Sequence, residues 1–293
     1  MADQSGSGDF NVGRSVRKVG AFVSAVAVLA LGACSAMDLD SSVVESVEGA
    51  KACVMCDLRY KSFKGMRLDG IDLRGAYLFN TNLERTSMIG ANLESAVMIL
   101  TDFERSDLTG ANLAKANMQR AILFGATLRG ADMTVANLEG ANLEAAELSY
   151  ANLTTANMSG AIMTDVFANN AEMPSAELKQ AKMDKANLRS ANLQGANLAG
   201  ADLTGANLTL ANLGSANLAG ADLSGAILNY TNLRGADLTG AKLIGASLTG
   251  ANLKQALFIK ADMTDASMSS VVKAGTNFCG AKMPDGTAGD CKK

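Results

Sequence analysis

ANLRSANLQGANLAGADLTGANLTLANLGSANLAGADLSG, residues 186–225, is the stretch that decides the fold of this chain. It repeats every five residues as Ala, then Asn or Asp, then Leu, then two variable residues. The same register runs over residues 56–285 without insertion or deletion, and the central residue is Leu, Met or Phe at every fifth position except Ala168 and Lys273. An internal repeat of this regularity determines the architecture before any other sequence signal.

A period of five residues fits neither regular secondary structure. Positions five apart rotate around the axis of an α-helix, whose period is about 3.6, and they alternate between the two faces of a flat strand, whose period is about 2. The chain must therefore turn a corner in each repeat, so that every central residue points to one common axis.

Over residues 56–285 the pattern resembles the A(D/N)LXX repeat of the pentapeptide-repeat family. The resemblance implies an all-β fold, a right-handed quadrilateral parallel β-helix in which four repeats make one coil, with about eleven coils in this chain. The central Leu would fill the interior, and the Ala two positions earlier would also point inward. The Asn or Asp between them would bond to backbone groups at a turn, and the Gly that ends many repeats would ease the corner.

The composition indicates a surface function rather than catalysis. The chain has no His and no Trp, and aromatic residues make up 4% of it. His is the commonest general base and metal ligand, and a filled interior leaves no pocket, so we expect no enzyme activity, no cofactor and no metal site. The methionines at repeat centres are predicted to fill the core. Residues 56–285 hold 22 acidic and 20 basic residues, a balance that gives no electrostatic case for a nucleic-acid partner.

The N-terminus has the features of a bacterial export signal. A polar, basic segment precedes an uncharged stretch at residues 19–33, as in a secretory signal peptide. The stretch ends in Leu31-Gly32-Ala33-Cys34, which resembles the lipobox of bacterial lipoproteins. That resemblance implies a signal peptide at 1–33, cleavage before Cys34, a lipid on the Cys34 thiol and, because Ser35 follows, the outer membrane in a cell with two membranes.

Two other interpretations of the same segment stay open. Ala30-Leu31-Gly32 has small residues at the spacing that ordinary signal cleavage requires. Val19 to Met37 is uncharged and has close to the about 20 residues that a membrane helix needs, so an uncleaved anchor is the second alternative. The polar segment is long for a signal, and a start at Val12 would shorten it.

The repeats also set the remaining boundaries. Residues 34–55 are predicted to form a linker and an N-terminal cap, with a short helix at 41–51 that begins in a sequence with capping-box spacing. Residues 56–285 are predicted to form the β-helix. Residues 286–293 are predicted to fold back as a C-terminal cap or tail.

Four cysteines lie at the two ends of the repeat region: Cys53, Cys56, Cys279 and Cys291. In an exported protein an even number of cysteines suggests disulfides. A Cys279–Cys291 disulfide would hold the tail over the end of the β-helix. Cys53 and Cys56 would either pair with each other or remain thiols.

Outward residues twenty positions apart stack directly if four repeats make one coil. This stacking predicts an apolar patch near the N-terminal end of one face, formed by Tyr60, Tyr77, Phe79, Val97, Ile99 and Leu100. A smaller patch on another face would contain Leu210, Ile227 and Tyr230. Exposed apolar patches often mark contacts with partners, although stacked neighbours on a flat sheet also cover one another.

The expected function is that of a non-catalytic, exported scaffold of the cell envelope. It would be attached to the membrane through the lipid on Cys34 and would bind an unidentified protein partner on the faces of the β-helix. The family suggests one alternative, because some of its members resemble duplex DNA and protect DNA gyrase. That role needs a strongly acidic surface and a cytosolic address, and this sequence indicates neither.

Overall fold

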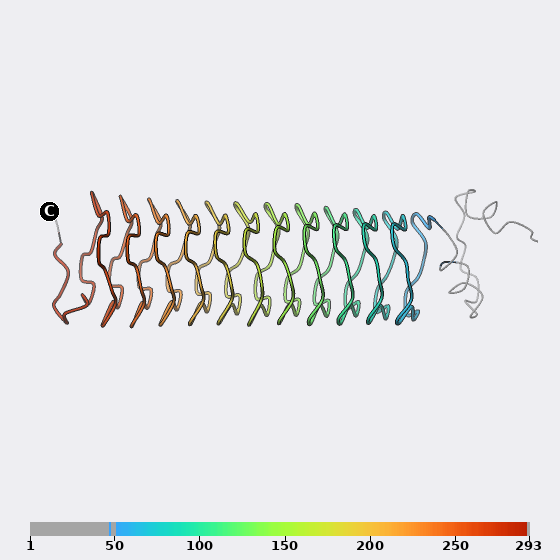
Figure 1. Cartoon of the computed structure of the whole chain (residues 1–293), viewed down its shortest axis with the longest axis horizontal. Helices are drawn as coiled ribbons and strands as arrows, with labels where there is room; N and C mark the ends of the chain where they lie inside the picture. Colours follow the sequence, from blue (N-terminus) through green and yellow to red (C-terminus); the bar gives the residue numbers. More distant parts are fainter. Residues whose placement is uncertain (1–46, 48–50, 292–293) are drawn as a thin grey trace, which may run out of the picture. The chain divides into compact units, whose positions relative to one another are not determined.

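The computed structural model describes Val47 and residues 51–291, which lie in a compact unit spanning Cys34–Lys293. The described chain winds into a stack of similar coils (Figure 1). The positions of each repeat are called first, second, central, fourth and fifth, so that Ala191, Asn192, Leu193, Gln194 and Gly195 form one repeat.

Parallel β-bridges join each coil to the next. They form between second-position residues twenty apart, from Ala52 with Asp72 to Asp262 with Lys282. One coil is therefore twenty residues long and has four sides, as the resemblance of the repeats implies. No bridge in residues 51–291 extends into a longer strand, because each repeat turns a corner before a second bridging residue can follow.

Backbone hydrogen bonds run in both directions along the stack. The central Leu193 donates its N–H to the carbonyl oxygen of Asn212 in the following coil, at 2.7 Å, and Asn212 donates its own N–H to Ala191 in the preceding one, at 2.9 Å. The same pattern recurs on all four sides. Each coil thus supplies the hydrogen-bond partners of the next, which is why no repeat is stable alone.

The corners fall at the fifth position. Every fifth-position residue from Met55 to Gly280 has a positive φ, and the N–H that follows the corner donates to the central carbonyl, as Ala211 does to Leu208 at 3.0 Å. This combination is that of a type II turn, which requires a positive φ at its third residue. Gly adopts such a φ without steric cost, so the predicted role of the terminal Gly is confirmed.

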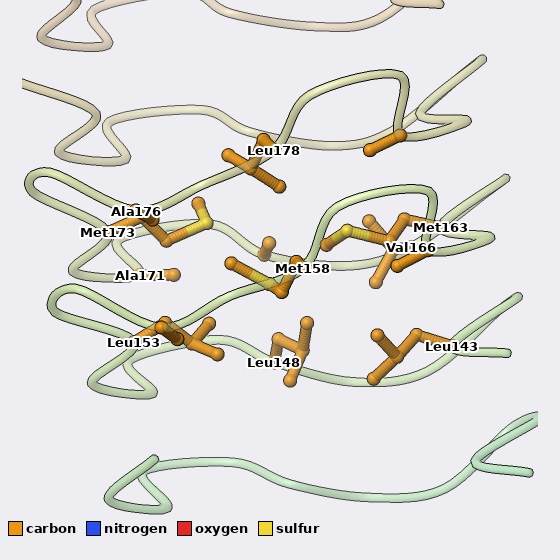
Figure 2. Packing of buried hydrophobic residues seen from close by; sticks show 14 of the residues in the cluster. Leu143, Leu148, Leu153, Met158, Met163, Val166, Ala171, Met173, Ala176 and Leu178 are labelled. Carbon is orange, nitrogen blue, oxygen red and sulfur yellow. The ribbon is translucent and has the colours of Figure 1, made fainter. Parts of the chain in front are cut away.

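Central and first-position side chains fill the interior. Figure 2 shows Leu143, Leu148 and Leu153 from three successive repeats pointing inward, and all three are buried. Met158 and Met163 continue the series and are fully buried, which confirms the methionines as core filler. One buried Leu contributes about 1.5–3 kcal/mol, whereas ordering five backbone residues costs about 5–10 kcal/mol, so stability has to come from the stacking of coils.

Second-position Asn and Asp side chains accept hydrogen bonds from backbone N–H groups at the turn, as predicted. The Oδ1 atom of Asn212 accepts the N–H of Gly214 at 3.2 Å, and Oδ1 of Asp222 accepts that of Ser224 at 3.0 Å. Within residues 51–291 no buried side-chain nitrogen or oxygen atom is left without a hydrogen-bond partner.

The two ends of the stack differ from a plain repeat. Ala52 already bridges Asp72 and Cys53 is a buried central residue, so the repeat geometry begins one repeat before Cys56. At the other end Ala288 forms an antiparallel bridge with Lys282. Val47 is helical and buried, but the rest of the predicted helix at 41–51, apart from Lys51, lies outside the described residues. That helix, the right-handed sense and the number of coils stay predictions.

The part of the chain that the structure describes contains no helix that is both long and apolar enough to cross a membrane.

Candidate protein-interaction surface

The six residues of the apolar patch lie on three successive coils. Tyr77 bridges Val97, so these side chains stand one above the other on the same side of the column. The rings of Tyr60 and Phe79 meet edge to face, with centroids 5.5 Å apart. The N–H of Asn80 donates to the carbonyl of Ile99 at 3.0 Å, which fixes the coil of Phe79 beneath that of Ile99. The structure therefore brings together the residues that the sequence grouped.

The patch is open to solvent along its corner. Tyr60 is 67% exposed, Tyr77 45% and Leu100 41%, while Phe79 and Ile99 are half-buried beneath their neighbours. Stacking thus covers part of the apolar area but leaves the corner side chains free. An exposed aromatic and aliphatic cluster of this kind is typical of a surface that contacts another protein.

A shallow groove of ≈ 440 Å³ continues the patch toward the C-terminal end of the column. Its lining residues are Ile99, Leu100, Gln119, Arg120, Glu139, Gly140, Ser159 and Gly160. The groove exists because the corner residues change from long side chains at Leu100 and Arg120 to none at Gly140 and Gly160. The sequence prediction missed it, although the same stacking at a spacing of twenty carries the signal.

Polar groups border the patch and the groove. Below the patch, Arg59 binds Asp57 through two bonds, Nε to Oδ1 at 2.8 Å and Nη2 to Oδ2 at 2.6 Å. The Arg59 side chain holds the pKa of the Asp57 carboxyl below its usual value. Above the patch, Gln119 donates to Glu139 at 3.1 Å. An apolar centre with a polar rim has the anatomy of a protein–protein interface.

The smaller patch occupies another side. Leu210 is 50% exposed and Tyr230 64%, and both are corner residues of consecutive coils. Ile227, on the adjoining side, bridges Asn207 and is 40% exposed. This patch is narrower than the first, because polar residues flank it on the next side.

The cysteines lie where the repeats begin and end. Cys53 and Cys56 are disulfide-bonded to each other and buried in the first coil. Cys279 and Cys291 are disulfide-bonded across the tail. Cys34, the predicted lipid attachment site, lies outside the described residues. Across residues 51–291 no three Cys, Asp or Glu side chains are placed to hold a metal ion together.

Known proteins resemble this chain through its repeats. The model of the family described as pentapeptide repeats (8 copies) matches residues 56–94, 101–140, 128–165, 136–173, 171–209, 206–243, 216–255, 236–272 and 246–285. No curated protein sequence matches the chain.

Several solved structures are similar to it. HetL, a pentapeptide repeat protein involved in heterocyst differentiation regulation from the cyanobacterium Nostoc sp. strain PCC 7120, is 28% identical over 86% of this chain and 100% of its own, with a TM-score of 0.32. Full-length QnrB1, a plasmid-mediated fluoroquinolone resistance protein, is 16% identical over 75% of this chain and 92% of its own, with a TM-score of 0.21. A pentapeptide repeat protein of the Arabidopsis thaliana thylakoid lumen is 28% identical over 38% of this chain and 60% of its own, with a TM-score of 0.14. With TM-scores this low, it is the repeats and the β-bridges that establish the architecture of this chain.

Proposed function

The chain belongs to the pentapeptide-repeat family, and from this membership we propose that it is a non-catalytic scaffold that binds a protein partner through the apolar patch. The observation that carries the proposal is the patch itself, with Tyr60 and Leu100 exposed at one corner, Tyr77 exposed on the adjoining side and a groove beside them. The interior is filled with Leu, Met and Ala side chains, so an interaction has to use the outer surface.

The charge of the surface favours a scaffold over a DNA mimic. Residues 56–285 carry 22 acidic and 20 basic residues. Many of these charges are compensated locally, as in the ion pair between Arg105 and Glu104 at 3.0 Å and that between Lys115 and Glu94 at 2.9 Å. A mimic of duplex DNA needs a continuous acidic surface, so gyrase protection is the weaker alternative.

A capture experiment with matched variants tests the patch. The chain would be cross-linked to its bound proteins in cells and then purified. The captured proteins would be compared between wild type and the double variant Phe79→Asp with Ile99→Asp. Ile244→Asp is the control, because Ile244 is, like Ile99, a fourth-position Ile at the outer surface but lies on another side of the column. A partner that the double variant loses and Ile244→Asp retains supports the proposal. Capture that the double variant leaves unchanged removes the patch from consideration.

We further propose that the scaffold is exported and attached to the outer membrane through a lipid on Cys34. The support is the sequence Leu31-Gly32-Ala33-Cys34 after an uncharged stretch. Feeding cells a radioactive fatty acid should label the wild-type chain and not Cys34→Ala. An unlabelled chain shortened by its signal would indicate ordinary cleavage instead, and an unlabelled chain of full mass would indicate an uncleaved anchor.

A further inference from the structure

Gly214 is the one glycine of residues 51–285 that lies outside a corner with positive φ. It occupies the fourth position of its repeat, where any residue fits the backbone and where Thr204 and Thr209 stand in the two preceding repeats. A Cβ built on Gly214 would lie 3.2 Å from Oδ1 of Asn212 and 3.3 Å from Nδ2 of Asn232. The missing side chain therefore uncovers two second-position amides.

The gap opens into a polar notch of ≈ 430 Å³ on the outer surface. Its lining residues are Gln194, Asn212, Gly214, Ser215, Asn232, Arg234, Gly235 and Gln255, all from one side of successive coils. This side adjoins the one that carries the apolar patch, but the notch shares no residue with that patch. The site is therefore independent of the proposed scaffold function.

The floor of the notch is a row of stacked asparagine side-chain amides, in which more N–H donors than acceptor oxygens are left without a partner. Asn232 donates from Nδ2 to Oδ1 of Asn212 at 2.8 Å, and Asn212 donates in the same way to Asn192 at 3.2 Å. Oδ1 of Asn212 also accepts the backbone N–H of Gly214, and Oδ1 of Asn232 accepts both the backbone N–H of Arg234 and Nδ2 of Asn252. The acceptors are thus occupied twice, whereas each amide keeps a second N–H that can point outward.

The charges around the notch are positive. Arg234 is exposed at its edge, Lys254 stands in the same repeat position one coil further, and neither side chain forms an ion pair within the described chain. The four repeats of this side between residues 191 and 255 contain no acidic residue. The nearest acid on this side is Glu172, one coil below Asn192, and its Oε2 atom already accepts Nδ2 of Asn192 at 2.7 Å. A guanidinium without a carboxylate is suited to an oxyanion of a ligand.

An aromatic ring stands at the corner beside the notch. Tyr230 lies two residues before Asn232 and is 64% exposed. Its ring covers Gly250 of the next coil, since a Cβ at Gly250 would lie 2.6 Å from Cδ1 of Tyr230. The ring thus lies over Gly250, where a side chain would displace it, and most of the Tyr230 side chain stays open to solvent. A flat, exposed tyrosine ring can stack against the apolar face of a sugar ring.

We propose that this notch binds an acidic saccharide, with the carboxylate of a uronic acid at Arg234, hydroxyl and ring oxygens at the amides of Asn212 and Asn232, and a neighbouring sugar against Tyr230. An excess of donors matches a ligand rich in acceptor oxygens. An acidic peptide fits less well, because its own N–H groups need acceptors. On this side the backbone carbonyls of the first four positions of each repeat already accept backbone N–H groups, which leaves only the corner carbonyls.

Binding of a galacturonic acid tetramer to the purified chain would be measured by calorimetry, beside its methyl ester and tetraglutamate. Gly214→Thr fills the notch with a side chain that other repeats carry at this position, and Arg234→Gln removes the charge. Ala219→Thr is the matched control, because it adds the same side chain at the fourth position of the next repeat, on another side. Thermal unfolding of each variant shows whether it is folded.

We expect the tetramer to bind wild type and Ala219→Thr equally, and Gly214→Thr and Arg234→Gln about tenfold or more weakly, as the loss of a charge-assisted hydrogen bond implies. Loss of binding on esterification or in high salt agrees with the proposal. No binding by the wild type, or binding that both notch variants leave unchanged, overturns it. Equal, notch-dependent binding of tetraglutamate overturns the saccharide assignment in favour of an acidic peptide. If Gly214→Thr fails to fold, Arg234→Gln decides alone.

Discussion

Val166 and Ala168 lie in the same repeat with their sizes exchanged, and both side chains are fully buried. Elsewhere the first position usually holds Ala and the central position Leu, Met or Phe. Here the larger Val takes the first position while the small Ala takes the centre, and Figure 2 shows Val166 beside Met163. The parallel bridge of Phe167 with Asn187 is kept, so the exchange leaves the ladder uninterrupted, although Val with Ala fills the interior with one methylene fewer than Ala with Leu.

This exchange predicts a strong coupling between the two positions. Ala168→Leu alone should destabilise the chain by about 1–3 kcal/mol through overpacking, and Val166→Ala alone by a similar amount through a cavity. The double variant restores the ordinary Ala and Leu arrangement and should lie within about 1 kcal/mol of wild type. Thermal unfolding of the four proteins measures the coupling, and additive effects would show that the two side chains do not share one space.

The repeat pattern predicted the fold because each repeat position has one physical environment. Leu193 is central and buried, Ala191 is first and buried, and Gly195 is at a corner with positive φ, as their residue types indicate. The first repeat was missed because Lys51 and Ala52 do not fit the pattern, although Cys53 occupies a buried centre. The Cys53 side chain is buried because the next coil covers it, and the sequence of this repeat alone does not indicate that contact.

The sequence predicted a candidate site only where the side chains that are present form it. The apolar patch was found because Tyr77 and Val97 stand twenty residues apart. The groove at Gly140 and the notch at Gly214 were missed because each depends on a side chain that is absent beside longer ones. The register of five places Gly195 at a corner and Gly214 at a fourth position, but it does not show which neighbouring side chains leave space around a glycine.

Exchanging Gly and Ala at two equivalent corners should change the stability of the chain in opposite directions. Gly110 has a φ of 63°, and a Cβ added to it would meet no atom within 4 Å, so Gly110→Ala should cost about 1 kcal/mol from the backbone alone. Ala145 has a φ of 55° at an equivalent corner. Ala145→Gly should have the opposite sign, by less than about 1 kcal/mol, because relief of the corner is partly offset by the greater freedom of unfolded Gly. Shifts of the thermal midpoint in the same direction for both variants would contradict this account.

Low pH should lower the stability of the N-terminal coils. Hydrogen bonds from Arg59 and Arg74 lower the pKa of Asp57 and Asp72 respectively. A carboxyl whose folded pKa is depressed contributes stability above the unfolded pKa of about 3.9, and this stability is lost as the pH falls through the folded pKa. Both pairs are partly exposed, so each should contribute less than about 1 kcal/mol.

Hydrogen exchange at pH 7 and at pH 3 measures this contribution, once intrinsic rates are corrected. The variant Asp57→Asn with Asp72→Asn should lose protection at pH 7 and show a smaller further loss at pH 3 than wild type in residues 57–80. Asp202→Asn is the control, because Asp202 forms no ion pair in the described chain and its carboxylate accepts hydrogen bonds from Thr204. An equal dependence on pH in wild type and the double variant would rule out these carboxyls as its source.

The disulfide between Cys279 and Cys291 should stabilise the C-terminal tail. The tail is otherwise held by few hydrogen bonds, among them that from Gly280 N–H to the carbonyl of Gly289 at 3.1 Å. Closing a loop of this length contributes about 3 kcal/mol in the chain-entropy view. Cys279→Ser with Cys291→Ser should therefore speed amide exchange at Gly280 and Gly289 but not near Leu193. Unchanged exchange at Gly280 would show that the tail is held without the disulfide.

Lys273 should keep the last coil from stacking on a second chain. It occupies a central position, but its side chain is exposed because no coil follows on that side in the described chain. The N–H of Leu253, one coil below, donates to the carbonyl of Val272 at 2.7 Å, whereas the N–H of Lys273 meets no acceptor among residues 51–291. An open ladder edge is a template for association, and a charge directed along it opposes that association.

Lys273→Leu should therefore associate end to end more strongly than wild type, since a second apolar end could then cover the exposed leucine. Lys273→Arg keeps the charge and should behave as wild type. Lys254→Leu is the control for added apolar surface, because Lys254 is exposed on the same side but at a fourth position. Its N–H already donates to Oδ1 of Asn252, and its carbonyl accepts the N–H of Gly235. Sedimentation equilibrium at matched concentrations compares the four proteins. Association of Lys254→Leu to the same extent as Lys273→Leu would mean that general surface hydrophobicity, and not the open edge, causes it.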